Sequence, residues 1–169
     1  FFFVLKKRVN DYSAITYGIG HGGAEVILVA GFAYINNYLT AQAINLSFEA
    51  PFDADVMAEL AAASVSLSEL LPRDMLLTIV IEAAAICMHV MYTFIIARGV
   101  QYGTTKICLP LAAGMHFFYL FISSLVGRMP DGILWQAIFS AAVAAACVYY
   151  LLEARRRAVM AEYEKRRTS

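Results

Sequence analysis

The stretch MLLTIVIEAAAICMHVMYTFIIA at residues 75–97 decides the fold class of this chain. A helix needs ~20 consecutive apolar residues to cross a bilayer, and this stretch is that long with a single acid inside it. Three other stretches, residues 12–45, 107–126 and 133–152, have similar length and apolar character. The sequence therefore predicts an all-α fold, a polytopic bundle with four transmembrane helices.

Composition agrees with that class. Of the 169 residues, 61% are hydrophobic and only 15% are charged, which is typical of an integral membrane protein rather than a soluble domain. Lys and Arg number 13, as do Asp and Glu, so nothing in the net charge points to an acidic partner such as nucleic acid. We expect one membrane domain over residues 1–169, with the lipid bilayer as its first partner.

The positions of the basic residues predict the orientation. With four spans, the clusters at residues 6–8, 98–106 and 155–167 fall on one side of the membrane, and of the 13 basic residues only Arg73 and Arg128 fall on the other. The positive-inside rule makes the first side cytoplasmic, including a charged tail at residues 153–169. Residues 1–8 resemble the end of a preceding helix followed by a basic loop, so we expect the chain to be a fragment.

The connections between the spans carry local signals. In the longest, residues 47–73, acidic residues alternate with apolar ones at roughly helical spacing, which favours a short helix on the outer membrane surface; a plain solvated connector is the alternative. Pro72 suits the first turn of the next span, and residues 130–132 form a tight turn. The three cysteines, Cys87, Cys108 and Cys147, fall inside spans and predict no disulfide.

The first span contains an unusual polar and glycine-rich run, YGIGHGGAE at residues 17–25. Gly18 and Gly22 have the GxxxG spacing that lets another backbone approach closely, and we expect helix packing at all four glycines of the run: Gly18, Gly20, Gly22 and Gly23. His21 and Glu25 are four residues apart and so share one helical face. Ionisable groups inside a membrane are costly and usually functional.

All three histidines of the chain fall at one predicted depth. His21 lies about ten residues from the cytoplasmic end of its span, and His89 and His116 lie at nearly the same distance in theirs, or ~13–15 Å at ~1.5 Å per residue. Glu25 lies one turn deeper and within reach of this layer. Glu82 precedes His89 by two turns and therefore lies outside this layer, so we expect it to support the site from a distance or to be structural.

The three histidines and Glu25 could support either of two kinds of chemistry, and the residues alone do not decide between them. Glu25 in a poorly hydrated pocket can act as a general base on water while imidazoles stabilise an oxyanion. The same residues, His21, Glu25, His89 and His116, could instead hold a metal such as zinc with room for water. The cofactor therefore stays unknown, with zinc and a metal-free mechanism both open.

The glycine-rich run, the Glu82 and His89 pair seven residues apart and the central His116 resemble the YhfC family of bacterial membrane proteins. That family is grouped with the CAAX-type prenyl proteases, the PrsW-like proteases and the scaffold subunit of gamma-secretase. The resemblance implies a glutamic-type intramembrane endopeptidase of the bacterial cytoplasmic membrane that cleaves membrane proteins or peptides. It implies Glu25 as the base and His89 and His116 as its partners, with His21 beside them.

Two other functions fit the same residues. A non-catalytic scaffold could use the glycine-rich face and the polar groups to bind partner helices. A transporter could use the histidines and glutamates as proton or metal sites, although no internal repeat or interrupted helix pair supports that reading. The leading hypothesis is hydrolysis of peptide bonds.

Overall fold

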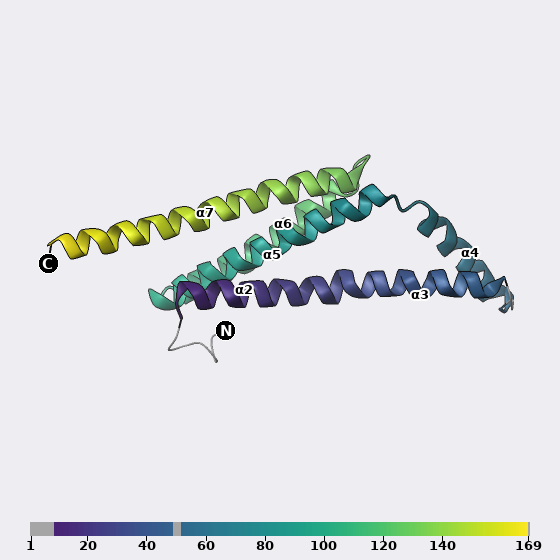
Figure 1. Ribbon diagram of the computed structural model, residues 1–169, viewed down its shortest axis with the longest axis horizontal. Helices are drawn as coiled ribbons and strands as arrows, with labels where there is room; N and C mark the ends of the chain where they lie inside the picture. Colours follow the sequence, from purple (N-terminus) through teal and green to yellow (C-terminus); the bar gives the residue numbers. More distant parts are fainter. Residues whose placement is uncertain (1–8, 49–51, 169) are drawn as a thin grey trace.

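The computed structural model describes residues 9–48 and 52–168, apart from the Lys165 side chain, and the described part of the chain is helical with no strand (Figure 1). Four helical segments are long and apolar enough to cross a membrane, so the predicted all-α fold with four spans is confirmed. The expectation for residues 1–8 lies outside the described residues.

The first span is one long helical path made of three segments. Helix α2 (Asp11–Val26) begins at Asn10, whose side chain accepts a 2.8 Å hydrogen bond from the Ser13 backbone N–H. A short π-helical segment, η1 (Ile27–Gly31), follows and leads directly into α3 (Phe32–Ser47). The helical path therefore extends slightly beyond the predicted residues 12–45, and its π segment was not predicted.

The connection after the first span contains helix α4 (Ala54–Ser68), as its spacing predicts. Helix α4 packs against α3 and slopes from the end of α3 toward the start of the next span (Figure 1). The alternative of a connector without a helix is therefore wrong, whereas the location of α4 on the outer membrane surface stays a prediction.

The remaining spans are α5 (Pro72–Gln101), α6 (Thr105–Val126) and α7 (Gly132–Thr168). Pro72 occupies the first turn of α5, as predicted. The turn between α6 and α7 places Asp131 at a positive φ of 56°. A side chain on Gly132 would collide with the backbone carbonyl of Gly127, which explains the glycine at this turn. Helix α7 continues through the charged segment after residue 152, as the tail was expected to do.

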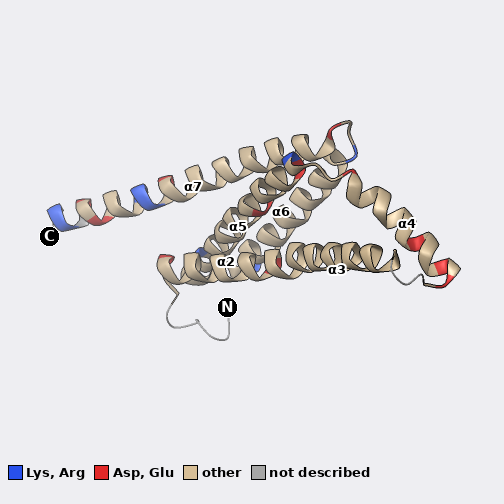
Figure 2. Cartoon of the chain, turned by 45° about the vertical axis from the view of Figure 1, so that its right-hand side comes forward, with Lys and Arg blue, Asp and Glu red and all other residues tan. Residues whose placement is uncertain are grey.

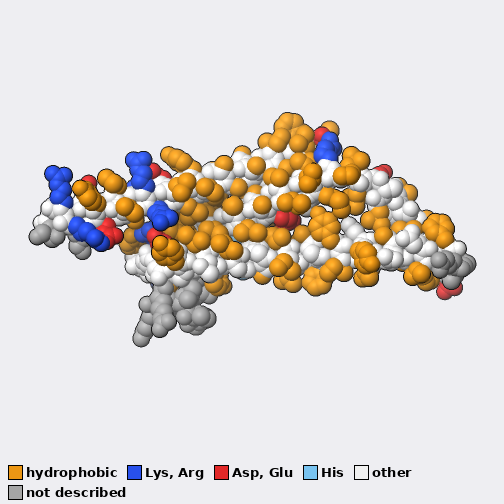
Figure 3. Space-filling model, in the orientation of Figure 1, with side chains coloured by type: hydrophobic (Ala, Val, Ile, Leu, Met, Phe, Trp, Pro, Cys, Tyr) orange, Lys and Arg blue, Asp and Glu red, His pale blue; other side chains and the backbone are white. Residues whose placement is uncertain are grey.

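Helix α5 is the centre of the bundle and packs against α2, α6 and α7. The largest buried cluster lies where α5, α6 and α7 meet, and it comprises Met88, Met91, Tyr92, Ala112 and Cys147. Apolar side chains also cover the outside of the bundle, a surface that suits lipid rather than water (Figure 3). All three cysteines are free, as predicted.

The basic side chains lie mainly toward the two ends of the molecule. Lys and Arg gather along the far end of α7 and at the end of the bundle where α2 starts, with a smaller group at the opposite end (Figure 2). Arg98 and Lys106 lie in the end turns of α5 and α6 rather than in a loop between them. The bundle is that of an integral membrane protein, and the assignment of the more basic end to the cytoplasm stays a prediction.

Candidate functional site

Two glycines bring α2 against α5. A Cβ atom on Gly18 would lie 2.5 Å from Cα of Val90, and one on Gly22 would lie 2.9 Å from Cβ of His89. Both values are shorter than real Cβ contacts, so only glycine allows this approach. The close packing of the two helix backbones places His89 directly beside the polar face of α2.

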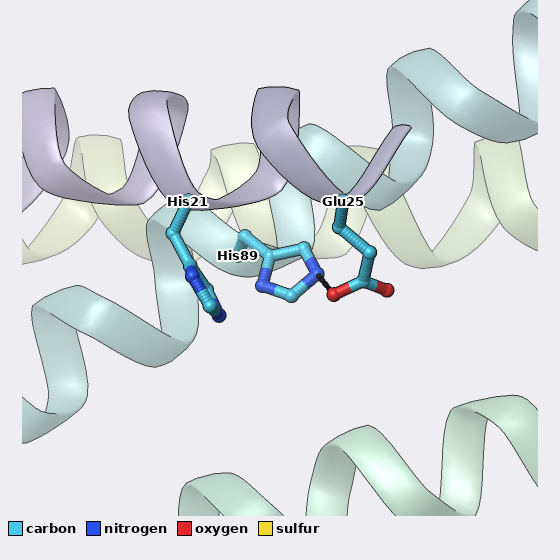
Figure 4. Close-up of side chains that lie close together, drawn as sticks. All are labelled: His21, Glu25 and His89. Atoms are coloured by element: carbon cyan, nitrogen blue, oxygen red, sulfur yellow. Dashed lines mark ion pairs between the residues drawn. The ribbon is translucent and has the colours of Figure 1, made fainter. Parts of the chain in front are cut away.

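That polar face carries His21 and Glu25, one turn apart. Nε2 of His89 lies 3.1 Å from Oε2 of Glu25, which forms a polar link between α5 and α2 (Figure 4). The His89 side chain is buried, with 7% of its surface exposed, whereas Glu25 is 39% exposed. Thr93 lies one turn after His89 on α5, and its hydroxyl donates a 2.8 Å hydrogen bond to the His89 backbone carbonyl.

The three histidines come together at one level. The ring centroids of His21 and His89 are 5.1 Å apart, and those of His89 and His116 are 5.2 Å apart. These rings come from α2, α5 and α6, so the layer inferred by counting residues from the basic ends corresponds to real proximity. The structure thus gathers all four residues predicted for catalysis, while their roles stay a prediction.

A cavity of about 370 Å³ opens beside these side chains. It is lined by His21, Glu25, His89, Tyr92, Thr93, Ala112, Ala113 and His116. Tyr92 and Thr93 were missed by the sequence reading, although they follow His89 by three and four residues and therefore share its helical face. The Tyr92 ring lies 5.6 Å from the His116 ring, centroid to centroid, and so forms the wall between α5 and α6.

Three of the four residues fit a metal ion. One ligand atom from each of His21, Glu25 and His89 lies within 4.8 Å of the other two. Zinc at ~2.0–2.1 Å from each ligand needs ligand atoms roughly 3.3 Å apart, so small side-chain rotations would close the set. Two histidines and one glutamate form an established set for catalytic zinc, with the fourth position left to water or substrate. His116 is not part of this group.

The other predicted residues lie around the site without lining its cavity. Glu82 lines a second cavity, between α3 and α5, and is near enough to Glu25 for the two carboxylates to interact electrostatically. No atom of the described residues outside the helix's own backbone and neighbouring positions lies within 4 Å of a Cβ built on Gly20 or Gly23. The packing role of these two glycines therefore finds no partner in the described part of the chain.

Comparison with known proteins identifies the family of the chain. The family model described as YhfC intramembrane metalloprotease matches residues 1–138, which include all four residues of the candidate site. No match was found among curated proteins, and none among solved structures. The family match confirms the prediction of a membrane-embedded protease. The chain therefore belongs to the YhfC intramembrane metalloprotease family.

Proposed function

We propose that the protein hydrolyses peptide bonds of membrane-associated proteins or peptides with a metal held by His21, Glu25 and His89. The observation that carries this proposal is the group of three ligand atoms within 4.8 Å of one another, inside a membrane-spanning bundle. The family description, which names a metalloprotease, supports it. Kinship with the CAAX-type and PrsW-like proteases remains an expectation from the resemblance.

Each residue then has a distinct task. A zinc ion held by this group would act as a Lewis acid that polarises a peptide carbonyl and makes water more acidic. His21 and Glu25 present their metal-ligand atoms from one face of α2, and His89 presents its ligand nitrogen from the buried side of the cavity. His116, on α6 at the opposite wall, is placed to donate a hydrogen bond to the oxyanion that develops on the carbonyl oxygen.

A metal-independent mechanism is the competing account, and the direct contact between Glu25 and His89 favours it. At 3.1 Å, the His89 nitrogen can donate to the Glu25 carboxylate and orient it toward a water molecule. In this glutamic-type mechanism Glu25, oriented by His89, removes a proton from water while His116 stabilises the oxyanion. The two mechanisms share the same residues and differ in the need for metal.

Metal content and activity, measured on the same purified variants, test the proposal. We expect about one equivalent of zinc in the parent, loss of most of it in His21→Ala and Glu25→Gln, and loss of cleavage of membrane-embedded peptides in both. The matched variant His116→Ala is expected to keep its metal and to lose ~10²–10³-fold in kcat, because it removes one oxyanion donor.

Three outcomes would contradict parts of this proposal. Unchanged zinc content in both ligand variants would remove the ligand assignment. Cleavage that survives thorough chelation but is abolished by Glu25→Gln would favour the glutamic-type mechanism. Cleavage by Glu25→Gln at the parent rate would show that this cavity is not the active site.

A further inference from the structure

A second cavity lies in the gap where α3 separates from α5. Helix α2 packs along α5, but η1 begins two residues after Glu25, and beyond it α3 packs against α4 instead (Figure 1). The gap holds a cavity of about 300 Å³ bounded by residues of η1, α3, α5 and the start of α7. We call this cavity the α3–α5 wedge. Besides the hydroxyl of Tyr34, its polar lining residues are Asn37, Asp74, Thr78 and Glu82.

The polar residues of the wedge form a stripe along one face of α5. Asp74, Thr78 and Glu82 are each four residues apart, so their side chains lie above one another on one side of the helix. Asn37 faces the same cavity from α3. The stripe runs from the first turn of α5 inward over ~12 Å, at ~1.5 Å per residue. Leu76 and Ile79, between these positions, are 66% and 61% exposed on the apolar outside of the bundle.

The carboxylate of Glu82, at the inner end of this stripe, has no hydrogen-bond or ion-pair partner among the described residues, and its oxygens are not sealed inside the protein. A carboxylate within a membrane span is strongly unfavourable unless it is hydrogen-bonded. Water in the wedge would supply those hydrogen bonds.

Glu82 also links the wedge to the candidate active site. It lies near enough to Glu25 for electrostatic interaction, and the side chains of η1 that line the wedge, Val29 and Ala30, follow Glu25 within five residues. Two carboxylates that interact electrostatically repel one another in a medium of low dielectric constant, and water between them reduces that repulsion. Glu82, at the inner end of the wedge, lies two turns of α5 from His89, the residue that contacts Glu25 at 3.1 Å.

We propose that the α3–α5 wedge is a water-filled route from the end of the bundle where α5 begins to the Glu25–His89 pair, with Glu82 as a positioning residue that holds water at its inner end. The use of this water rests on the proposed function, since hydrolysis of each peptide bond adds a hydroxyl to the carbonyl carbon and a hydrogen to the amide nitrogen. The existence of the route does not depend on catalysis.

Chemical accessibility of single cysteines tests the route directly. Cys87, Cys108 and Cys147 are first replaced by Ala, and one thiol is then introduced by Thr78→Cys, Asn37→Cys or the matched lipid-facing control Ile79→Cys. In native membranes carrying the full chain, a charged methanethiosulfonate reagent should modify the first two at least ~10-fold faster than the third, because thiolate formation and a charged reagent both require water. Equal, slow modification of all three would overturn the route.

Substitution of Glu82 tests its part in the route. Glu82→Leu should slow modification of the Thr78→Cys thiol and lower kcat while leaving KM and zinc content unchanged, and Glu82→Gln, which still binds water, should restore most of both rates. Parent-like kcat and labelling in Glu82→Leu would remove Glu82 from the proposal. Rapid labelling in a chain that never cleaves would count against the proposed function only, and cleavage without labelling at positions 37 and 78 would count against the route only.

Discussion

Gly18 and Gly22 determine how closely α2 can approach α5, and Gly18 has the tightest contact of the two. Because a Cβ at Gly18 would meet the Val90 backbone at 2.5 Å, no side-chain rotation can make room for it. We expect Gly18→Ala to push the helices apart and to lower the free energy of unfolding by ~1–3 kcal/mol, the usual cost of overpacking. Reversible unfolding in detergent micelles measures this change.

Gly20 is the matched control for that experiment. Its Cβ would find nothing within 4 Å among the described residues, so Gly20→Ala should be neutral or stabilise the protein by up to ~1 kcal/mol through helix propensity. If both substitutions destabilised the protein equally, Gly20 would also pack against a neighbour, as the sequence reading expected.

At this scale, residue counting predicted that the polar groups meet, and GxxxG spacing singled out Gly18 and Gly22. The further expectation that Gly20 and Gly23 pack finds no neighbour among the described residues. His21, His89 and His116 share a depth because the rise per residue is constant in any straight helix. Their rings lie side by side because all three also face the same interface between α2, α5 and α6. The face of α2 that meets α5 depends on helix rotation about its axis, which the sequence of a glycine-rich run does not specify. Tyr92 was missed because an aromatic residue in an apolar helix has no signal of its own and is marked only by sharing the helical face of His89.

Among the elements, η1 is the feature that apolar periodicity could not reveal. The residues ILVAG at 27–31 have no composition that distinguishes a π turn from an α turn. A π segment amounts to one extra residue in the helical ladder, and such segments occur often at functional sites. Helix η1 lies where α5 slopes away from the straight α2–α3 path (Figure 1), and its Val29 and Ala30 line the wedge between α3 and α5.

Deletion of one residue from η1 should change which face of α3 lines the wedge. Removing Val29 would restore regular α-helical bonding and rotate the following helix by ~100°, the angle of one residue at 3.6 per turn. Zinc content should persist, because His21 and Glu25 precede the deletion, but a thiol introduced at Asn37 should leave the wedge and lose its fast labelling. Val29→Ala, which keeps the number of residues, is the control. Fast labelling that survives the deletion would contradict this account of η1.

Two ion pairs connect elements at opposite ends of α5. Asp11 and Arg98 join α2 to α5 at 3.0 Å, with side chains 38% and 24% exposed, whereas Arg73 and Asp131 join α5 to the α6–α7 turn at 2.8 Å and are more exposed. After allowance for solvent screening, we expect a coupling energy of ~0.5–1 kcal/mol for the first pair and near zero for the second. Double-mutant cycles with Asp11→Asn and Arg98→Gln, and with Arg73→Gln and Asp131→Asn, measure both. Equal coupling in the two cycles would contradict this ranking.

For the whole molecule, the helix order predicts that both described ends of the chain lie on one side of the membrane and the α6–α7 turn on the other. Four crossings return the chain to its starting side, and of the 13 basic residues only Arg73 and Arg128 fall at the turn side. The positive-inside rule predicts that this turn faces outward. The α3–α5 wedge, which begins near the start of α5, would then draw its water from outside the cell.

Thiol labelling of intact cells checks this orientation. In the background without native cysteines, Met129→Cys at the α6–α7 turn should react with an impermeant maleimide from outside, because Met129 is 52% exposed there. Ala161→Cys in the exposed tail of α7 should react only after the membrane is permeabilised. The opposite pattern would reverse the orientation, and the wedge would then open to the cytoplasm. Labelling of both thiols from the same side would show that α7 does not cross the membrane between positions 129 and 161.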